Sequence, residues 1–172
     1  MSQINWPAVG LTILPNVGGI AGGILVRKNI DTWYASLKKP EWRPPNAAFG
    51  PVWTSLYTSM GYASYLVYRD GEGLNGPARL PLIVYGSNIL LNWAWTPIFF
   101  GAKDPKLALA EIQLVNLTAL GTGYLFYKIN PVAGYLIIPY CLWLGLATAL
   151  NYVIWRDNKD SSKAKITEIK DN

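Results

Sequence analysis

Four tryptophans and one asparagine are the side chains of this 172-residue chain whose positions point most clearly to chemistry. Trp53, Trp93, Trp95 and Trp143 lie within long uncharged stretches, away from the stretch ends where anchoring at a membrane interface would explain them. Helical rise places all four, together with Asn92, about 10–18 Å from one common end of those stretches. Aromatic faces and an amide at one depth predict a pocket for a large, flat, mostly apolar molecule.

Helical spacing is compatible with convergence of these side chains. Residues three, four or seven apart share a helix face, and two such faces are predicted, one with Asn88, Asn92 and Trp95 and the other with Tyr140, Trp143, Ala147 and Leu150. The same pattern would arise if the aromatic rings merely filled the core of a bundle. A loop rich in aromatic residues and proline favours the pocket, because it is typical of a lid over an open end. The predicted lid residues are Trp33, Tyr34, Pro40, Trp42, Pro44 and Pro45.

The sequence offers little for covalent catalysis or metal binding. It has no histidine, and its single cysteine, Cys141, lies inside the last uncharged stretch, so histidine ligands, a histidine base and an intramolecular disulfide are excluded. No catalytic residue and no metal site is predicted. Glu111 is the one acidic side chain inside an apolar stretch, which makes it a functional hypothesis by default. We favour a structural role, in which Glu111 reaches the interface, pairs with Lys106 or Lys103, or is protonated.

Five stretches of roughly twenty or more residues that lack Lys, Arg, Asp and Glu, Glu111 excepted, must position these side chains. They cover 1–26, 44–68, 80–102, 107–127 and 129–155. About 20 apolar residues cross a bilayer as an α-helix. We therefore predict an all-α integral membrane protein with a five-transmembrane-helix bundle at 1–158, its spans at about 6–26, 46–68, 80–102, 107–127 and 131–155. A cytosolic lid loop at 27–45 and a flexible cytosolic tail at 159–172 complete the prediction.

The distribution of lysine and arginine predicts the orientation of the bundle. One side carries Arg27, Lys28, Lys38, Lys39, Arg43, Lys103, Lys106, Arg156, Lys159, Lys163, Lys165 and Lys170, and the other carries only Arg69, Arg79 and Lys128. Positive loops stay in the cytosol, so the C-terminus is predicted to be cytosolic. The net charge of +5 is then a topology signal, helped by anionic lipid headgroups, and nucleic acid is not a predicted partner.

A run of small residues at 18–23, Gly-Gly-Ile-Ala-Gly-Gly, lies in the first stretch. Such residues let another helix approach closely. Packing against helices of the same chain is the favoured explanation, and a homodimer contact stays open as the alternative.

Long motifs occur in order along the chain. They are Trp33-Tyr34-x-x-Leu37-x-Lys39-Pro40-x-Trp42-x-Pro44-Pro45, Gly50-Pro51-Val52-Trp53-Thr54-x-Leu56-Tyr57, Asn92-Trp93-Ala94-Trp95-Thr96-Pro97-Ile98-Phe99-Phe100-Gly101, Ala149-Leu150-Asn151-Tyr152 and Trp155-Arg156-Asp157-Asn158. In these motifs the chain resembles the translocator protein family, also called tryptophan-rich sensory proteins or peripheral benzodiazepine receptors. The last motif resembles the animal members in particular.

The resemblance implies a five-helix bundle, often dimeric, that binds cholesterol, porphyrins including haem and protoporphyrin, and synthetic isoquinoline or benzodiazepine ligands. It implies residence in the outer mitochondrial membrane. It also implies that no cofactor is required and that porphyrin or haem is a ligand. The family's ligand cavity corresponds here to Gly23, Val26, Phe49, Val52, Trp53, Asn92, Trp95, Ala110, Leu114, Trp143, Ala147 and Leu150. One departure is Leu107, where vertebrate members carry a tryptophan, so affinity for the synthetic ligands is expected to differ.

Two further expectations follow from the resemblance. Leu150, Tyr152 and Arg156 match the family's sterol motif, although an interfacial tyrosine beside an arginine that reaches the headgroups would produce the same pattern. Some bacterial relatives degrade protoporphyrin in light, so a light-dependent porphyrin-degrading enzyme that uses Trp53 and Trp143 is the alternative to a binding or transport protein.

Overall fold

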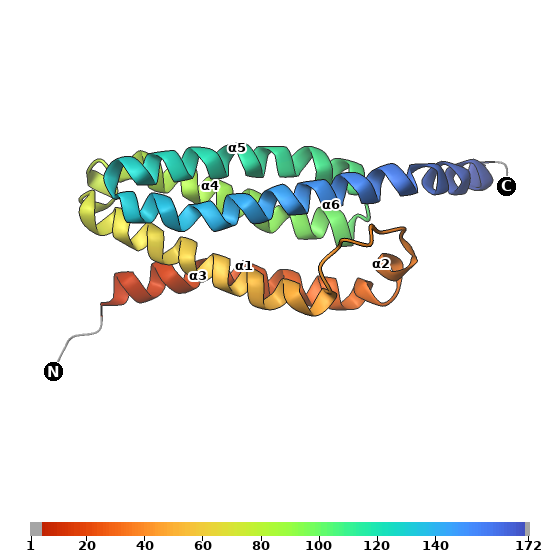
Figure 1. The fold of residues 1–172 in the computed structure, drawn as a ribbon, viewed down its shortest axis with the longest axis horizontal. Helices are drawn as coiled ribbons and strands as arrows, with labels where there is room; N and C mark the ends of the chain where they lie inside the picture. The colour runs from red at the N-terminus through yellow and green to blue at the C-terminus, as the bar shows by residue number, and fades with distance from the viewer. Residues whose placement is uncertain (1–4, 171–172) are drawn as a thin grey trace.

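The structure, a computed structural model, describes residues 5–170, with side chains placed as far as residue 159. Every regular element in this part of the chain is helical, which confirms the predicted all-α class. The elements are α1 (Trp6–Ile30), α2 (Trp33–Ser36), α3 (Asn46–Asp70), the 3-10 helix η1 (Gly73–Asn75), α4 (Arg79–Thr96), the π-helix η2 (Pro97–Gly101), α5 (Pro105–Ile129) and α6 (Pro131–Lys170). The long helices run side by side, and α2 lies at one end, called the α2 end below (Figure 1).

Side-chain caps and prolines set the starts of three long helices. Asn5, Asp104 and Asn130 accept hydrogen bonds of 2.9–3.2 Å from backbone N–H groups in the first turns of α1, α5 and α6. Proline occupies the first or second position of each of these helices, where a missing N–H has no cost. The local sequence therefore determines where these helices begin.

Pro97 changes the helical register at the α2 end of α4. A proline ring inside an α-helix removes one hydrogen bond and clashes with the preceding turn. The chain responds with a π-turn, in which the N–H of Ala102 donates to the carbonyl of Pro97 at 2.8 Å. This wider turn places both Phe99 and Phe100 in the interior.

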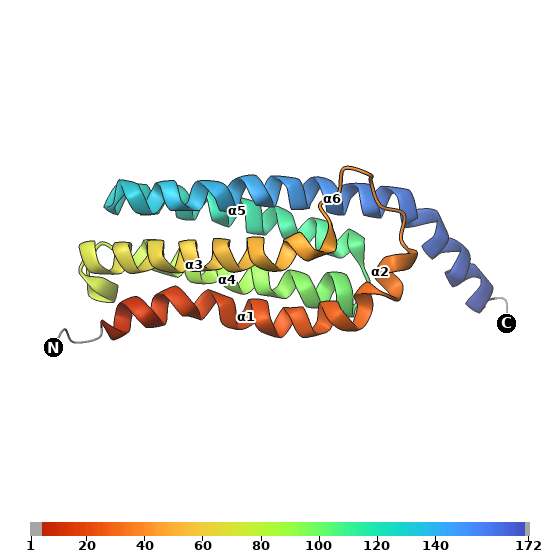
Figure 2. The same ribbon diagram turned by 60° about the horizontal axis from the view of Figure 1, so that its bottom comes forward.

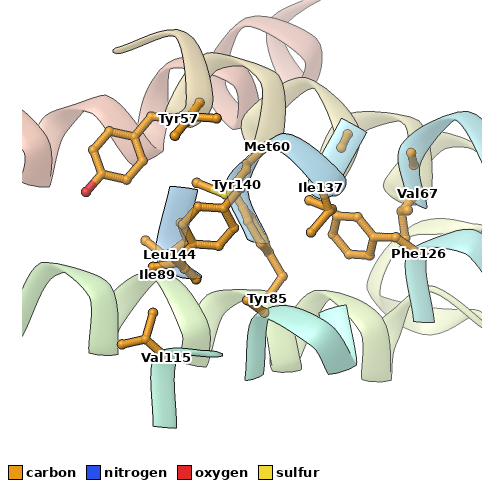
Figure 3. Packing of buried hydrophobic residues seen from close by; sticks show 14 of the residues in the cluster. Tyr57, Met60, Val67, Tyr85, Ile89, Val115, Phe126, Ile137, Tyr140 and Leu144 are labelled. Carbon is orange, nitrogen blue, oxygen red and sulfur yellow. The ribbon is translucent and has the colours of Figure 1, made fainter. Parts of the chain in front are cut away.

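The core of the bundle lies between α3, α4, α5 and α6. Met60, Val67, Phe126, Ile137 and Tyr140 belong to one cluster of buried side chains, part of which Figure 3 shows from close by. A second cluster occupies the α2 end and consists of Tyr34, Phe99, Phe100, Ala108, Leu150 and Ile154. The space between α1 and these two clusters is where the candidate site is found.

Helix α1 packs mainly on α3, and to a smaller extent on α4 and η2, at the edge of the bundle (Figure 2). Its outer face is apolar and exposed, with Ile13, Val17, Ile20 and Ile24 between 55 and 71 % exposed. An exposed apolar face of this length is what a lipid-facing helix presents.

The predicted count of five spans is not confirmed. Within the described residues, two helices are long and apolar enough to cross a membrane, Trp6–Ile30 and the part of α6 at Pro131–Lys159. Helices α3, α4 and α5 are less apolar because they carry amide, hydroxyl and phenol groups that are hydrogen bonded inside the bundle. Five crossings therefore stay a prediction.

Two predicted boundaries differ from the structure. Helix α1 continues to Ile30, so the segment that crosses the α2 end is 31–45 rather than 27–45. Helix α6 continues to Lys170, through most of the predicted tail at 159–172. The prediction that this tail is flexible concerns the side chains of residues 160–170 and the whole of residues 171–172. These lie outside the part of the chain that the structure describes.

Candidate ligand-binding site

A cavity of about 580 Å³ lies between the last half of α1 and the first half of α3, backed by α4, η2, α5 and α6. This volume is within the range of small-molecule sites, about 300–1,000 Å³. Its walls are mostly aromatic and aliphatic, with a few amide and hydroxyl groups. The composition suits a large apolar molecule with few polar atoms.

Several glycines on α1 and α3 lie where α1 packs closely on other helices, but Gly23, beside the cavity, does not. A Cβ atom on Gly61 would lie 2.5 Å from the carbonyl oxygen of Thr12, and one on Gly18 would lie 2.2 Å from the ring of Trp93. A Cβ on Gly23, by contrast, would meet no heavy atom within 4 Å. The small residues thus serve packing within the chain over the first part of α1, whereas Gly23 faces open space.

The cavity opens in the gap between α1 and α3. Exposed residues that line it form a row on each helix, with Ile20, Ile24 and Arg27 on α1 and Asn46, Gly50 and Thr54 on α3. The spacing of three to four residues keeps each row on one helix face. A ligand would therefore reach the cavity from the side of the bundle.

Two tryptophans on the cavity wall are held by packing and hydrogen bonds. Trp95 stacks on Phe99 with ring centroids 4.7 Å apart, and its Nε1 donates to Asn151 Oδ1 at 3.1 Å. Asn151 in turn donates to the carbonyl of Pro105 at 2.8 Å, which ties α4, α5 and α6 together. Trp93 donates from Nε1 to the carbonyl of Pro15 on α1 at 3.1 Å. Both indole N–H groups are thus used by the protein, so a ligand would contact these two side chains through ring carbons rather than through the N–H groups.

A chain of hydrogen bonds crosses the bundle at the inner end of the cavity. The hydroxyl of Tyr57 donates to Asn92 Oδ1, and Asn92 Nδ2 donates to the Tyr140 hydroxyl at 3.1 Å. Tyr140 donates to Asn88 Oδ1 at 3.1 Å. Asn88 Nδ2 then donates to the Val115 carbonyl and to the Thr118 hydroxyl, both at 2.9 Å. Polar groups from four helices are satisfied in this way, as a bilayer requires.

The structure brings most of the predicted site residues to this cavity. Those that line it are Gly23, Val26, Phe49, Trp53, Asn92, Trp95, Ala147 and Leu150. Val52 and Trp143 are half-buried and pack on the core beside it. Trp143 packs edge-on against Phe49 with centroids 5.6 Å apart, and its Nε1 is buried without a hydrogen-bond partner among the described residues.

Ala110 and Leu114 do not reach the cavity. Ala110 lines a shallow groove on the outer surface between α5 and α6, and Leu114 is 52 % exposed. The inward face of α5 carries Ala108, Ile112 and Val115 instead. A residue two positions along a helix is turned by about 200°, so Ala110 and Leu114 lie on the opposite side from Ala108 and Ile112.

Sequence reasoning did not single out Tyr57, Phe99, Phe100, Asn151 or the α5 residues Ile112 and Val115, all of which line the cavity. Tyr57 lies one helical turn after Trp53, so the period of 3.6 could have identified it. Phe99 and Phe100 follow Pro97, and their direction depends on the π-turn. Asn151 lies inside the last uncharged stretch, so the need of an amide in hydrocarbon for a partner could have identified it, as it did Asn92.

The predicted lid divides into buried and exposed parts. Tyr34 is 7 % exposed and lines the cavity, and Trp33 packs edge-on against Phe99 with centroids 5.5 Å apart. Trp42 is 52 % exposed, and Pro40, Pro44 and Pro45 are not among the described residues that line the cavity. The segment 31–45 therefore contributes one wall residue and a covering layer.

Cations gather around the ring of Tyr34. Lys39 Nζ lies 4.9 Å from the ring centroid and donates to the carbonyls of Tyr34 and Leu37, both at 2.6 Å. The Arg43 guanidinium lies 5.7 Å from the same centroid. Burial raises the pKa of the Tyr34 phenol, an effect that Arg43 partly offsets. Burial, and then the charge of Arg43, lower the pKa of Lys39.

Asn158 fastens the segment 31–45 to α6. Its Oδ1 accepts from the Lys38 N–H at 2.9 Å, and its Nδ2 donates to the Lys38 carbonyl at 3.0 Å. We expect Asn158→Ala to raise hydrogen exchange in 31–45 by roughly 5- to 150-fold, since two bonds of about 0.5–1.5 kcal/mol each are lost. Exchange mass spectrometry checks this, with the neighbouring Lys159→Ala as the control. Equal exchange in both variants would contradict the fastening role.

The three residues of the sterol motif do not converge. Leu150 is buried and lines the cavity, whereas Tyr152 is 46 % exposed and lines the outer groove. Arg156 is exposed, with Nε 2.6 Å from Asp157 Oδ1 and its guanidinium 5.9 Å from the Tyr152 ring centroid. Tyr152 and Arg156 thus lie together on the surface, and Leu150 faces the other way.

Glu111 is buried between helices. It is 9 % exposed, and both carboxyl oxygens lack a hydrogen-bond partner within the described part of the chain. It forms no ion pair there with Lys103 or Lys106. Of the structural alternatives, a lysine partner is therefore not realised among the described residues.

Comparisons with known proteins agree with the resemblance that the motifs in the sequence indicate. The sequence profile of the TspO/MBR family matches residues 11–156. The human translocator protein is 45 % identical over 152 residues, which cover 88 % of this chain and 90 % of the relative. The pig translocator protein is 41 % identical over 153 residues, covering 89 % and 90 %. A translocator protein homologue of Schizosaccharomyces pombe is 43 % identical over 119 residues, covering 69 % and 73 %. The predicted resemblance, including that to the animal members, is confirmed.

Proposed function

The chain belongs to the TspO/MBR family and is an integral membrane protein, and from that premise we propose that it binds cholesterol and porphyrins in the cavity between α1 and α3. The proposal is a membrane receptor or transport protein for haem, protoporphyrin and sterol. The observation that carries it is the cavity itself, about 580 Å³ in volume and lined by Trp53, Trp95 and Phe99. Stacked aromatic rings each add about 0.5–1.5 kcal/mol beyond the area that they bury.

The lining also supports ligands of this shape. Trp53 and Trp95 line one cavity, and each ring is held by a neighbouring ring, Trp53 by Tyr57 with centroids 5.2 Å apart and Trp95 by Phe99 stacked at 4.7 Å. Packed walls and a rigid guest both keep the entropy cost of binding low, because few rotatable bonds are immobilised on either side. A tetrapyrrole or a sterol is rigid, flat and mostly apolar. Synthetic isoquinoline and benzodiazepine ligands share these properties and are proposed as further partners.

We also propose the setting in which this function operates. Five crossings are proposed from the five uncharged stretches, and a cytosolic C-terminus from the lysine and arginine distribution. Residence in the outer mitochondrial membrane is proposed from the resemblance to animal relatives. A homodimer is part of the same proposal. Labelling of introduced cysteines with an impermeant maleimide, in a Cys141→Ser background, tests the orientation.

A titration of the purified protein tests the binding function. Protoporphyrin is added to protein in phosphatidylcholine nanodiscs, and tryptophan fluorescence is recorded with empty nanodiscs plus tryptophan amide as the control. We expect quenching that saturates at one porphyrin per chain and is reversed by cholesterol. Quenching that rises without saturation, as in the control, would sink the proposal. Porphyrin products that form in light, and are lost in Trp53→Phe, would instead favour the enzyme.

A further inference from the structure

Arg27 is the one Lys, Arg, Asp or Glu among the described residues that line the cavity. It lies in the last turn of α1, one helical turn after Gly23, and so on the same helix face as the open position there. Its side chain is exposed. The cavity therefore has a guanidinium at the α2 end of its opening.

A second guanidinium stands beside this opening. Arg43 donates from Nη1 to Asn46 Oδ1 and lies 5.7 Å from the ring centroid of Tyr34, and both Asn46 and Tyr34 line the cavity. Lys39 lies over the same ring. Positive charge is thus concentrated at this end of the cavity.

Acidic side chains do not neutralise this charge directly. The ion pairs of the described residues are Arg69–Asp70 and Arg156–Asp157. Arg27 forms none within that part of the chain, although Asp31 follows it by one helical turn. The inner end of the cavity, in contrast, offers only the neutral groups of Tyr57 and Asn92.

We propose that this end of the cavity recognises the carboxylate of an amphipathic ligand, and that Arg27 is the residue that binds it. The ligand lies with its apolar ring system against the tryptophans and its anionic end toward Arg27. A guanidinium pairs with a carboxylate through two parallel N–H donors. The inference rests on the proposed function, and it adds the ligand's charge and orientation. An arginine that only reaches out to lipid phosphates is the competing explanation.

Protoporphyrin and its dimethyl ester separate these explanations, because the two share a ring system and only the first carries carboxylates. Affinities are measured by fluorescence in phosphatidylcholine nanodiscs, which have no net charge. We expect wild-type protein to prefer the diacid. Arg27→Gln should weaken diacid binding by roughly 5- to 30-fold, because one partly exposed charge-assisted pair is lost. It should leave ester affinity unchanged. Arg27→Lys should retain part of the preference.

Lys28→Gln is the matched control, since Lys28 carries the same charge at the next position and is not among the described residues that line the cavity. It should leave the ratio of diacid to ester affinity unchanged. The same ratio in wild type and Arg27→Gln would overturn the proposal and favour contact with lipid phosphate. Unchanged ester binding shows that a variant is folded. Failure of wild-type protein to bind either porphyrin would instead reject the proposed function.

Discussion

Gly23→Leu is expected to weaken porphyrin and sterol binding by roughly 5- to 150-fold while leaving the protein folded. A side chain on Gly23 would enter space that holds no heavy atom within 4 Å of the added Cβ, and that space is part of the cavity. The bound ligand and the leucine would then compete for one volume, and overpacking of this kind costs about 1–3 kcal/mol. Fluorescence titration gives the affinity, and thermal unfolding gives the stability.

Gly10→Leu is the matched control for that experiment. Gly10 is on the same helix, and a Cβ there would also meet nothing within 4 Å, yet Gly10 is not among the described residues that line the cavity. Both substitutions replace a glycine inside a helix, and each therefore favours the helical state by about 1 kcal/mol through the higher helix propensity of leucine. Equal ligand affinity in the two variants would show that the space beside Gly23 is not the binding site.

Asn88→Ala is expected to lower the stability of the bundle by about 2–4 kcal/mol, a fall in Tm of about 5–15 °C. The Asn88 side chain is fully buried and makes three hydrogen bonds, with Tyr140, Val115 and Thr118. Its removal takes away all three of these bonds and leaves the Tyr140 hydroxyl without its acceptor between helices, where neither water nor lipid replaces the lost partner. Thermal unfolding in one detergent measures the effect.

Gln113→Ala controls for the loss of an amide from a helix. Gln113 is exposed, and within the described part of the chain its side chain bonds only to the Leu109 carbonyl of its own helix, at 3.2 Å. Its substitution should change Tm by less than about 2 °C. A similar Tm for Asn88→Ala and Gln113→Ala would mean that the hydrogen-bond chain contributes little to the bundle. Because Tyr57 and Asn92 belong to that chain, Asn88→Ala should also weaken ligand binding.

The all-helical class and much of the cavity could be predicted from the sequence. The strongest signals were the types of side chain inside the uncharged stretches and the long motifs that contain them. Trp53, Asn92 and Trp95 are out of place in hydrocarbon unless they face other helices or a ligand, and all three line the cavity. Their helices could be placed from charge-free stretches alone. Side-chain type and segment length therefore sufficed for these residues.

Rotation of a helix about its axis was harder to predict. On α6, Leu144 and Ala147 line the cavity, whereas Trp143 lies one position away, turned by about 100°. Ala110 on α5 shows the same effect. Small changes in packing angle decide which of two neighbouring positions faces inward, and periodicity alone does not resolve them.

The register change at Pro97 and the roles of the glycines could also be found only from the three-dimensional structure. A proline predicts a kink or break, but not that the chain forms a π-turn that buries Phe99 and Phe100. Gly18 and Gly23 occur in one run of small residues, yet one is against Trp93 and the other faces open space. Which neighbour lies opposite a glycine depends on how the helices pack, and the sequence pattern does not reveal that packing.

Photolabelling tests most directly whether the guest lies inside the bundle. A protoporphyrin monoester that carries a diazirine is bound, irradiated and located by peptide mass spectrometry, with excess protoporphyrin as the competitor. We predict competed adducts on residues that face the gap between α1 and α3, such as Ile24, Phe49 and Trp53. Adducts confined to the outer groove of α5 and α6, at Tyr152 or Trp155, would contradict the account.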